Sequence, residues 1–161
     1  MRRWKLGAAV VAGVTLAAAA VGARASMRAL NAQDYVEIQQ LYARYAWAVD
    51  THASDGMAYA ATYAPDGEFR LGDMTVKGHD ALAAYNLKMG TANRAPTHFV
   101  TNLVIEPSSD GAHGSAYLFI TTGEKPTLAM VGTYRDLLVK TSGGWRFKQR
   151  TLYLNAMPPA Q

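Results

Sequence analysis

The chain contains no cysteine, and this absence excludes several kinds of chemistry. It offers no disulfide, no thiolate nucleophile and no lipid-anchoring cysteine, and it is compatible with an oxidising compartment. The four histidines show no ligand spacing such as two His separated by three residues, so we expect no metal. A glycine-rich phosphate loop and a nucleophile elbow for Ser-His-Asp hydrolysis are also missing. We therefore expect a protein that works without a cofactor.

The mature chain lacks any excess of positive charge. Of the 16 Lys and Arg residues, four (Arg2, Arg3, Lys5 and Arg24) lie within the first 25 residues, which leaves 12 against 12 Asp and Glu. The sequence pI of about 9.4 therefore belongs largely to the N-terminal segment. Because no clustered basic face remains, we expect no nucleic-acid partner.

The first 25 residues have the order of a secretory signal peptide. An uncharged stretch follows the basic start, and residues 23–25 (Ala-Arg-Ala) form a cleavage site before Ser26. An uncleaved membrane anchor is the alternative, but a stretch dominated by Ala and Gly would hold a bilayer weakly. We expect residues 26–161 to form one periplasmic or secreted domain that is free of the membrane. If translation starts at Met27, the protein is cytoplasmic.

The first half of the mature chain has a helical periodicity. Apolar residues from Val36 to Val49 recur at spacings of three and four, which predicts a helix of about five turns with Asn31 as its cap. Two further helices are predicted at Ser54–Tyr63 and Ala81–Met89. The sequence Ala64-Pro65-Asp66-Gly67 is expected to end the first of these two.

The second half is strand-like. Runs of β-branched and aromatic residues, separated by turn sequences, cover His98–Glu106, Gly114–Thr122, Thr127–Lys140 and Trp145–Leu154. A short hairpin, Glu68–Leu71 with Met74–Lys77, precedes the third helix. This order predicts an α+β fold, in which a curved antiparallel sheet packs on three N-terminal helices and encloses an apolar pocket.

The first of the long strands carries the most informative polar side chain. Strict alternation places His98, Val100, Asn102 and Val104 on one face. Asp50, near the end of the first helix, is a candidate to orient the His98 imidazole. A His that is backed by an acid can transfer protons near neutral pH without metal or coenzyme.

These residues also have structural interpretations. A single His on an apolar strand is often a core residue, and Asp50 can instead engage the loop that follows the helix, Thr51–Ser54. Tyr45 at helical spacing is typical of packing. The alternatives to an acid–base site therefore stay open at this level of reasoning.

The order of motifs resembles a SnoaL-like domain of the nuclear transport factor 2-like superfamily. The resemblance covers about Leu30 to Leu154. It rests on Tyr45-(x)4-Asp50, Ala64–Gly67, Gly78-His79, Thr97–Asn102, Gly132–Asp136 and Gly143–Phe147. It implies an α+β cone around a hydrophobic pocket, often dimeric through the sheet. Family enzymes include cofactor-independent dehydratases, isomerases and cyclases that act on small ring compounds, whereas other members only bind or hold assemblies together.

A distant similarity to scytalone dehydratase implies roles for individual residues. Asp50 and His98 match the Asp and His that carry out acid–base chemistry there. Val49 replaces a Tyr and Tyr117 a second His of that enzyme, so loss of water is only one option. Asn102 and Tyr134 match polar pocket positions of relatives.

We therefore expect a cofactor-independent lyase, eliminating water or formaldehyde, or an isomerase, which acts through His98 and Asp50 on a small aromatic or polycyclic substrate. The candidate substrate-binding residues, three of them possible donors to an oxyanion, are Tyr45, Asn102, Tyr117 and Tyr134. The alternatives are a non-catalytic periplasmic binding protein for small hydrophobic ligands and a dimeric interaction module. Polar residues in an apolar cavity favour the enzyme, because a carrier gains little from a proton-transfer pair.

Overall fold

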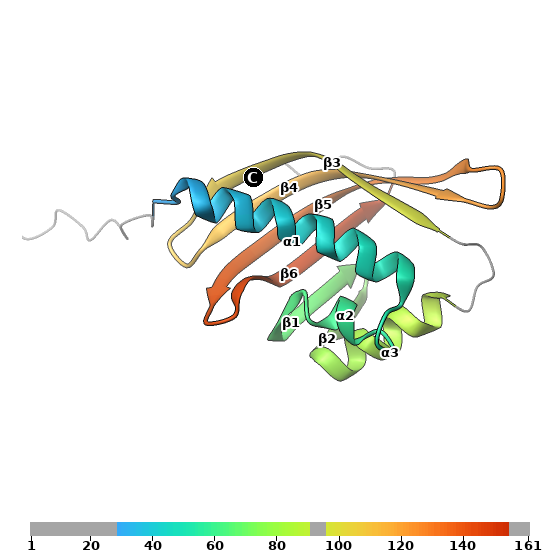
Figure 1. Ribbon diagram of the computed structural model, residues 1–161, viewed down its shortest axis with the longest axis horizontal. Coiled ribbons are helices and arrows are strands. Elements are labelled where there is room, and N and C mark those ends of the chain that lie inside the picture. Colours follow the sequence, from blue (N-terminus) through green and yellow to red (C-terminus); the bar gives the residue numbers. More distant parts are fainter. Residues whose placement is uncertain (1–28, 91–95, 155–161) are drawn as a thin grey trace, which may run out of the picture.

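The computed structural model describes residues 29–90 and 96–154, so the predicted signal peptide lies outside the described residues. The helices are α1 (Ala32–Thr51), α2 (Met57–Ala60) and α3 (His79–Gly90), and the strands are β1 (Tyr63–Leu71), β2 (Met74–Lys77), β3 (Thr97–Pro107), β4 (Ala112–Thr122), β5 (Thr127–Thr141) and β6 (Gly144–Leu154). Figure 1 shows α1 lying across one face of a curved sheet, with α2 and α3 beside its β1–β2 end. Within the described ranges no helix is both long and apolar enough to cross a membrane.

The six strands form one sheet in the order β2-β1-β6-β5-β4-β3. The antiparallel meander β3 to β6 and the hairpin β1–β2 agree with the sequence analysis. One pairing is different, because β1 lies parallel to β6. This pairing attaches the N-terminal hairpin to the last strand, and the α+β fold with a curved sheet is confirmed.

The long first helix forms as its sequence predicts. The side chain of Asn31 accepts a hydrogen bond from the backbone N–H of Asp34 at 3.0 Å, and the Asp34 carboxylate accepts one from the N–H of Asn31 at 3.1 Å. This reciprocal capping box satisfies two helix-end donors. The stripe of α1 that faces the sheet is buried and consists mainly of Ile38, Leu41, Tyr42 and Tyr45.

The predicted second helix is wrong in length. Only Met57–Ala60 is helical, and Ala64-Pro65-Asp66-Gly67 lies inside β1 rather than in a turn. Tyr63 pairs with Phe147 on β6, and the register then shifts before Glu68, so the Pro-containing segment is an irregularity in a strand. Long-range pairing with β6 therefore overrides the local helix and turn signals.

The predicted alternation along β3 is also wrong beyond Thr101. Asn102 adopts a left-handed conformation with φ of 54°, and the β3–β4 register shifts by one residue there. Such a bulge reverses which side chains face inward. His98 and Val100 remain on the inner face, but Asn102 and Val104 are exposed on the outer face.

The space between α1 and the middle of the sheet is filled by aromatic side chains around one buried cation. The guanidinium carbon of Arg150 lies 3.9 to 4.7 Å from the ring centroids of Tyr42, Tyr45, Tyr134 and Phe147. This part of the expected apolar pocket is therefore occupied by the protein's own core.

Arg150 is paired with Asp136 inside this core. Its Nε donates to Oδ1 at 2.9 Å, its Nη2 donates to Oδ2 at 2.7 Å, and the Tyr42 hydroxyl donates to the same Oδ2. Tyr42 passes directly over Gly114, where a Cβ would meet its hydroxyl at 2.1 Å. Glycine at this position makes the approach of Tyr42 to Asp136 possible.

Candidate active site

The structure brings Asp50 and His98 together. Nδ1 of His98 lies 2.5 Å from Oδ1 of Asp50, and the backbone N–H of His98 donates to Oδ2 at 3.0 Å. One carboxylate therefore fixes both the strand and the ring. In the neutral tautomer that this contact favours, Nδ1 carries the proton and Nε2 presents a lone pair. No described residue makes a hydrogen bond to Nε2.

Asp50 reaches His98 from the last turn of α1, which ends at Thr51. A carboxylate at this end of a helix faces the negative end of the helix dipole, which is unfavourable. Its hydrogen bonds in the described structure go to His98 and not to the loop Thr51–Ser54, which was the structural alternative for this residue. Asp50 is therefore placed to serve His98 rather than to cap its own helix.

The pair is neither sealed nor freely exposed. The His98 side chain is 12% exposed and that of Asp50 is 19% exposed. The sheet register places Ile120 of β4 beside His98 and Met130 of β5 one strand further along the same row, and both are half-buried, as is Val100. The surroundings of the imidazole on the inner face of the sheet are therefore apolar and partly reachable by solvent.

Asn86 of α3 belongs to this region, and the sequence analysis missed it. It is 1% exposed, and its Nδ2 donates to the carbonyl of Val49 at 3.2 Å, one residue before Asp50. Its Oδ1 is buried and has no hydrogen-bond partner among the described residues. The one available signal was a polar residue four positions after Leu82, on the apolar stripe of the predicted helix.

Tyr45 and Tyr134 form a second, deeper group. Both are almost completely buried, and their hydroxyl oxygens lie 3.3 Å apart. Burial, and next the neighbouring Tyr45 hydroxyl, raise the pKa of Tyr134 well above its ordinary value, so its hydroxyl stays protonated. The register puts Tyr134 four residues along β5 from Met130, a separation of about 13 Å along the strand. Among the described residues, neither hydroxyl makes a hydrogen bond with His98.

The remaining two predicted binding residues lie on the other side of the sheet. Tyr117 is 41% exposed, pairs with Thr101, and points outward in the alternation of β4. The side chain of Asn102 accepts a hydrogen bond from the Thr101 hydroxyl at 2.7 Å. The expectation that Asn102 and Tyr117 line the pocket with His98 is therefore wrong, for Asn102 because of the bulge. Within the described ranges no group of three His, Asp or Glu side chains that could hold a metal occurs.

The fold and the His–carboxylate pair define an α+β domain with a candidate acid–base site on the inner face of its sheet. A family model described as a SnoaL-like domain matches residues 31–151, and the chain belongs to this family of the nuclear transport factor 2-like superfamily. The family includes polyketide cyclases and dehydratases. No curated protein matches the chain in a sequence comparison.

Solved structures agree with this assignment. A variant of Rv3472 from Mycobacterium tuberculosis, described as of unknown function, is 28% identical, with a TM-score of 0.70 over 78% of this chain and 73% of that one. A protein of unknown function with a cystatin-like fold, from Nostoc punctiforme, is 26% identical, with a TM-score of 0.70 over 81% of this chain and 97% of that one. Aln2 from a Streptomyces species is 27% identical, with a TM-score of 0.69 over 78% and 94%.

Proposed function

We propose that this protein is a cofactor-independent lyase or isomerase in which His98 transfers a proton on a small aromatic or polycyclic substrate. The observation that carries the proposal is the 2.5 Å contact between His98 Nδ1 and Asp50 Oδ1, which leaves Nε2 as the reactive nitrogen. The pair is half-buried, which suits a group that must be oriented by the protein and also meet a substrate.

The proposed reaction begins with neutral His98. Nε2 takes a proton from a carbon next to a carbonyl group, and Asp50 stabilises the resulting imidazolium. In an elimination, the electrons of the broken C–H bond form a C=C bond and the C–O bond to the leaving group breaks. Nε2–H then returns the proton to that oxygen, which departs as water. In an isomerisation, the proton returns to a different carbon. Such acid–base assistance contributes about 10²–10⁴-fold to a rate.

The substrate class follows from the neighbours of His98. Val100, Ile120 and Met130 are half-buried on the inner face around it. An apolar wall with one polar reactive group favours a ring compound whose polar atoms are few. The partial exposure of the pair suits substrates that enter from solvent. We propose export to the periplasm or beyond as the setting.

The outer face of the sheet supports a second candidate function, that of a homodimeric interaction module. Large apolar side chains are exposed there, among them Phe99 at 52%, Val104 at 55% and Leu128 at 60%. Exposed apolar groups of this size on one sheet face are typical of protein–protein contact. Sedimentation of Phe99→Asp beside the unchanged protein tests it, and a monomer in both would contradict a dimer through the sheet.

Turnover tests the enzyme directly. The protein, treated with a chelator, is incubated with a panel of small aromatic alcohols and diaryl diols, and mass spectrometry reports loss of water, loss of formaldehyde or isomerisation. We expect His98→Gln and Asp50→Asn each to lower the rate at least 100-fold. Tyr117→Phe, on the outer face, is the matched control and should leave the rate unchanged. Ligand binding without turnover, unaltered in both variants, would establish a carrier and reject the enzyme.

A further inference from the structure

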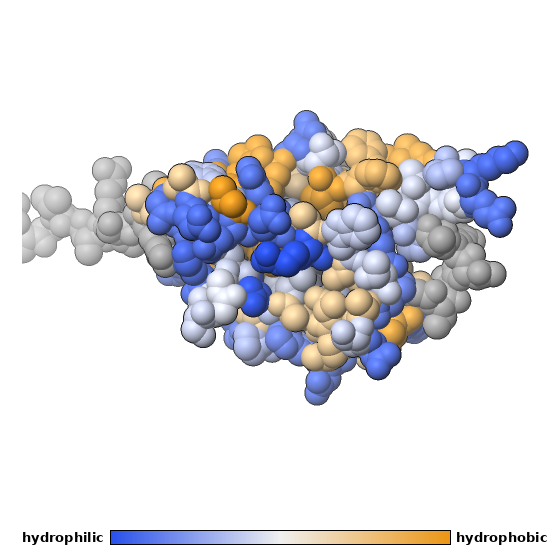
Figure 2. Space-filling model, viewed as in Figure 1, coloured by the Kyte–Doolittle hydropathy of each residue, from blue (hydrophilic) through white to orange (hydrophobic). Residues whose placement is uncertain are grey.

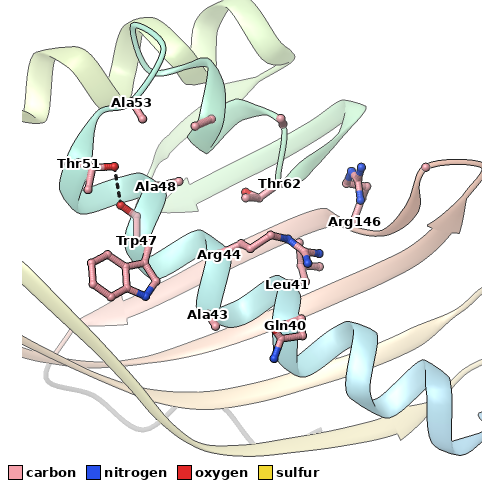
Figure 3. Close-up of a pocket in the computed structure, with 13 residues that line it drawn as sticks. Gln40, Leu41, Ala43, Arg44, Trp47, Ala48, Thr51, Ala53, Thr62 and Arg146 are labelled. Carbon is pink, nitrogen blue, oxygen red and sulfur yellow. Dashed lines mark hydrogen bonds between the residues drawn. The ribbon is translucent and has the colours of Figure 1, made fainter.

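A groove runs along the outer side of α1, between this helix, the α2 region and the β5–β6 turn (Figure 3). Its volume is about 770 Å³, within the range of small-molecule sites, and its lining does not include His98 or Asp50. Aliphatic side chains form six of its thirteen lining residues: Leu41, Ala43, Ala48, Ala53, Ala58 and Ala61.

The charged residues of the groove lie at one end of it. Figure 3 shows Gln40, Arg44 and Arg146 at one end and Trp47 and Thr51 at the other. From Gln40 to Thr51 the helix rises about 16 Å. On the face shown in Figure 2, a strongly hydrophilic patch over α1 lies beside a mildly apolar area over α2. The groove is therefore cationic at one end and mainly apolar along the rest, where the hydroxyls of Thr51 and Thr62 are bonded to backbone carbonyls.

The two arginines differ from the paired cations of β5 and β6 in having no acidic partner among the described residues. Lys140, Lys148 and Arg150 each pair with a carboxylate, whereas neither Arg44 nor Arg146 makes an ion pair with a described residue. Arg146 is half-buried, and its Nη1 donates to the carbonyl of Trp145 at 2.8 Å, which holds the guanidinium over the turn. Two guanidinium groups whose charge no described acid neutralises are complementary to a planar anion.

Trp47 completes the arrangement at the far end. Its side chain is 74% exposed, although the burial of a large aromatic ring is energetically favourable. A ligand that begins at the arginines and extends along the alanines would cover part of this ring. The charge and the apolar wall thus specify one kind of molecule, an anion with an apolar body.

We propose that this groove binds an amphipathic carboxylate, with the carboxylate at Arg44 and Arg146 and an apolar chain or ring running toward Trp47. The site is separate from the His98–Asp50 pair, and it does not depend on the proposed reaction. An acidic segment of another protein is a different occupant, which the test below separates.

Decanoate is the probe, with 1-decanol as its uncharged analogue. Binding is followed by tryptophan fluorescence and by calorimetry in the full chain, in the double variant Arg44→Gln/Arg146→Gln, and in Arg70→Gln as the matched control on β1. We expect saturable decanoate binding that weakens at least tenfold in the double variant and in 0.5 M salt, and that is unchanged in Arg70→Gln. Decanol should bind at least tenfold more weakly, and Trp47→Phe should abolish the fluorescence change while calorimetric binding remains.

Three results would overturn this assignment. Equal affinity for decanoate and decanol would show that the arginines recognise no carboxylate. A loss in His98→Ala with none in the double arginine variant would place the ligand on the inner face of the sheet. No saturable binding of decanoate would exclude a small amphipathic carboxylate and leave an acidic protein segment as the occupant.

Discussion

Two pairs of a basic side chain and a carboxylate lie between α1 and the sheet, and they differ in solvent exposure and in the hydrogen-bonding positions that stay available. Arg150 and Asp136 are 0% exposed, and both carboxylate oxygens of Asp136 are held by Arg150, with Tyr42 adding a further donor to one of them. His98 and Asp50 are 12% and 19% exposed, and the second ring nitrogen of His98 has no partner among the described residues. The first pair is part of the core, whereas the second can meet a substrate.

This difference in exposure follows from where each pair lies in the sheet. Arg150 lies among fully buried aromatic rings in the middle of the inner face, where a charge without a partner would be costly. Burial lowers the pKa of Arg150, but the charge and the hydrogen bonds of Asp136, together with Tyr45 and Tyr42, outweigh burial and raise that pKa well above its ordinary value, so the guanidinium stays charged. His98 lies near the start of β3, where its neighbours are only half-buried.

The largest expected effect on stability comes from breaking the buried Arg150–Asp136 pair. Arg150→Met leaves the Asp136 carboxylate buried and unpaired, so we expect a loss of about 3–5 kcal/mol in the free energy of unfolding. Urea denaturation followed by circular dichroism measures it. The double variant Arg150→Met/Asp136→Leu should recover part of this loss, because it removes both charges. A loss below about 1 kcal/mol in the single variant would show that the pair is not a core element.

A third carboxylate, at the N-terminal end of α1, extends the comparison to the pH dependence of stability. Asp34 is 1% exposed, and it accepts hydrogen bonds from Lys140 Nζ at 2.7 Å and from Trp145 Nε1 at 3.0 Å. The Lys140 ammonium, followed by the backbone N–H of Asn31 and the Trp145 indole, lowers the pKa of Asp34 to about 2. Because the folded value lies below the unfolded one, this stabilisation is present above about pH 4 and is lost as the pH falls through about 2.

Asp34→Asn tests that assignment. We expect the variant to be less stable at pH 6, by on the order of 1–2 kcal/mol, and to lose less stability than the unchanged protein between pH 4 and 2. Urea midpoints across this range, read from circular dichroism, supply the measurement. Parallel pH curves for the two proteins would contradict the role given to Asp34.

Local patterns predicted much of the fold. The cap at Asn31, the stripe of α1, the hairpin β1–β2 and the four long strands all follow from spacing and turn chemistry within short segments. The pairing of Asp50 with His98 came from the family resemblance together with the residue types. Their 48-residue separation carries no local signal.

Irregularities in strands explain most of what the sequence did not predict. On β6 the register shifts between Phe147 and Gln149, which turns Arg150 inward, although strict alternation from Phe147 would place it on the outer face. The bulge at Asn102 has the same effect on β3. Whether a strand bulges depends on its partner strand. The sequence of one strand alone therefore could not predict which polar side chains, such as Arg150, face the core.

Asn86 connects α3 to the end of α1. We expect its substitution to affect stability less than a change in the Arg150–Asp136 pair and more than a change in the His98–Asp50 pair. Asn86→Ala removes the hydrogen bond to the Val49 carbonyl, and we expect a loss of about 1–2 kcal/mol in the free energy of unfolding. Hydrogen exchange of the amides of the last turn of α1 should increase in this variant, with little change in β5. An equal increase in exchange in the last turn of α1 and in β5 would mean that Asn86 acts on the whole core and not on the segment that carries Asp50.

The smallest effect on stability is expected at the candidate site itself. Asp50→Asn keeps an oxygen that can accept from His98, and it removes a negative charge from the unfavourable end of α1, a gain of about 0.3–1 kcal/mol that offsets the weaker hydrogen bonds. We therefore expect the free energy of unfolding to change by less than about 1 kcal/mol, while proton transfer is lost. Urea denaturation and turnover of the same sample decide this. A loss above about 3 kcal/mol would make Asp50 a structural residue like Asp136. A carboxylate at the unfavourable end of its own helix is best explained by the His98 ring nitrogen that it orients.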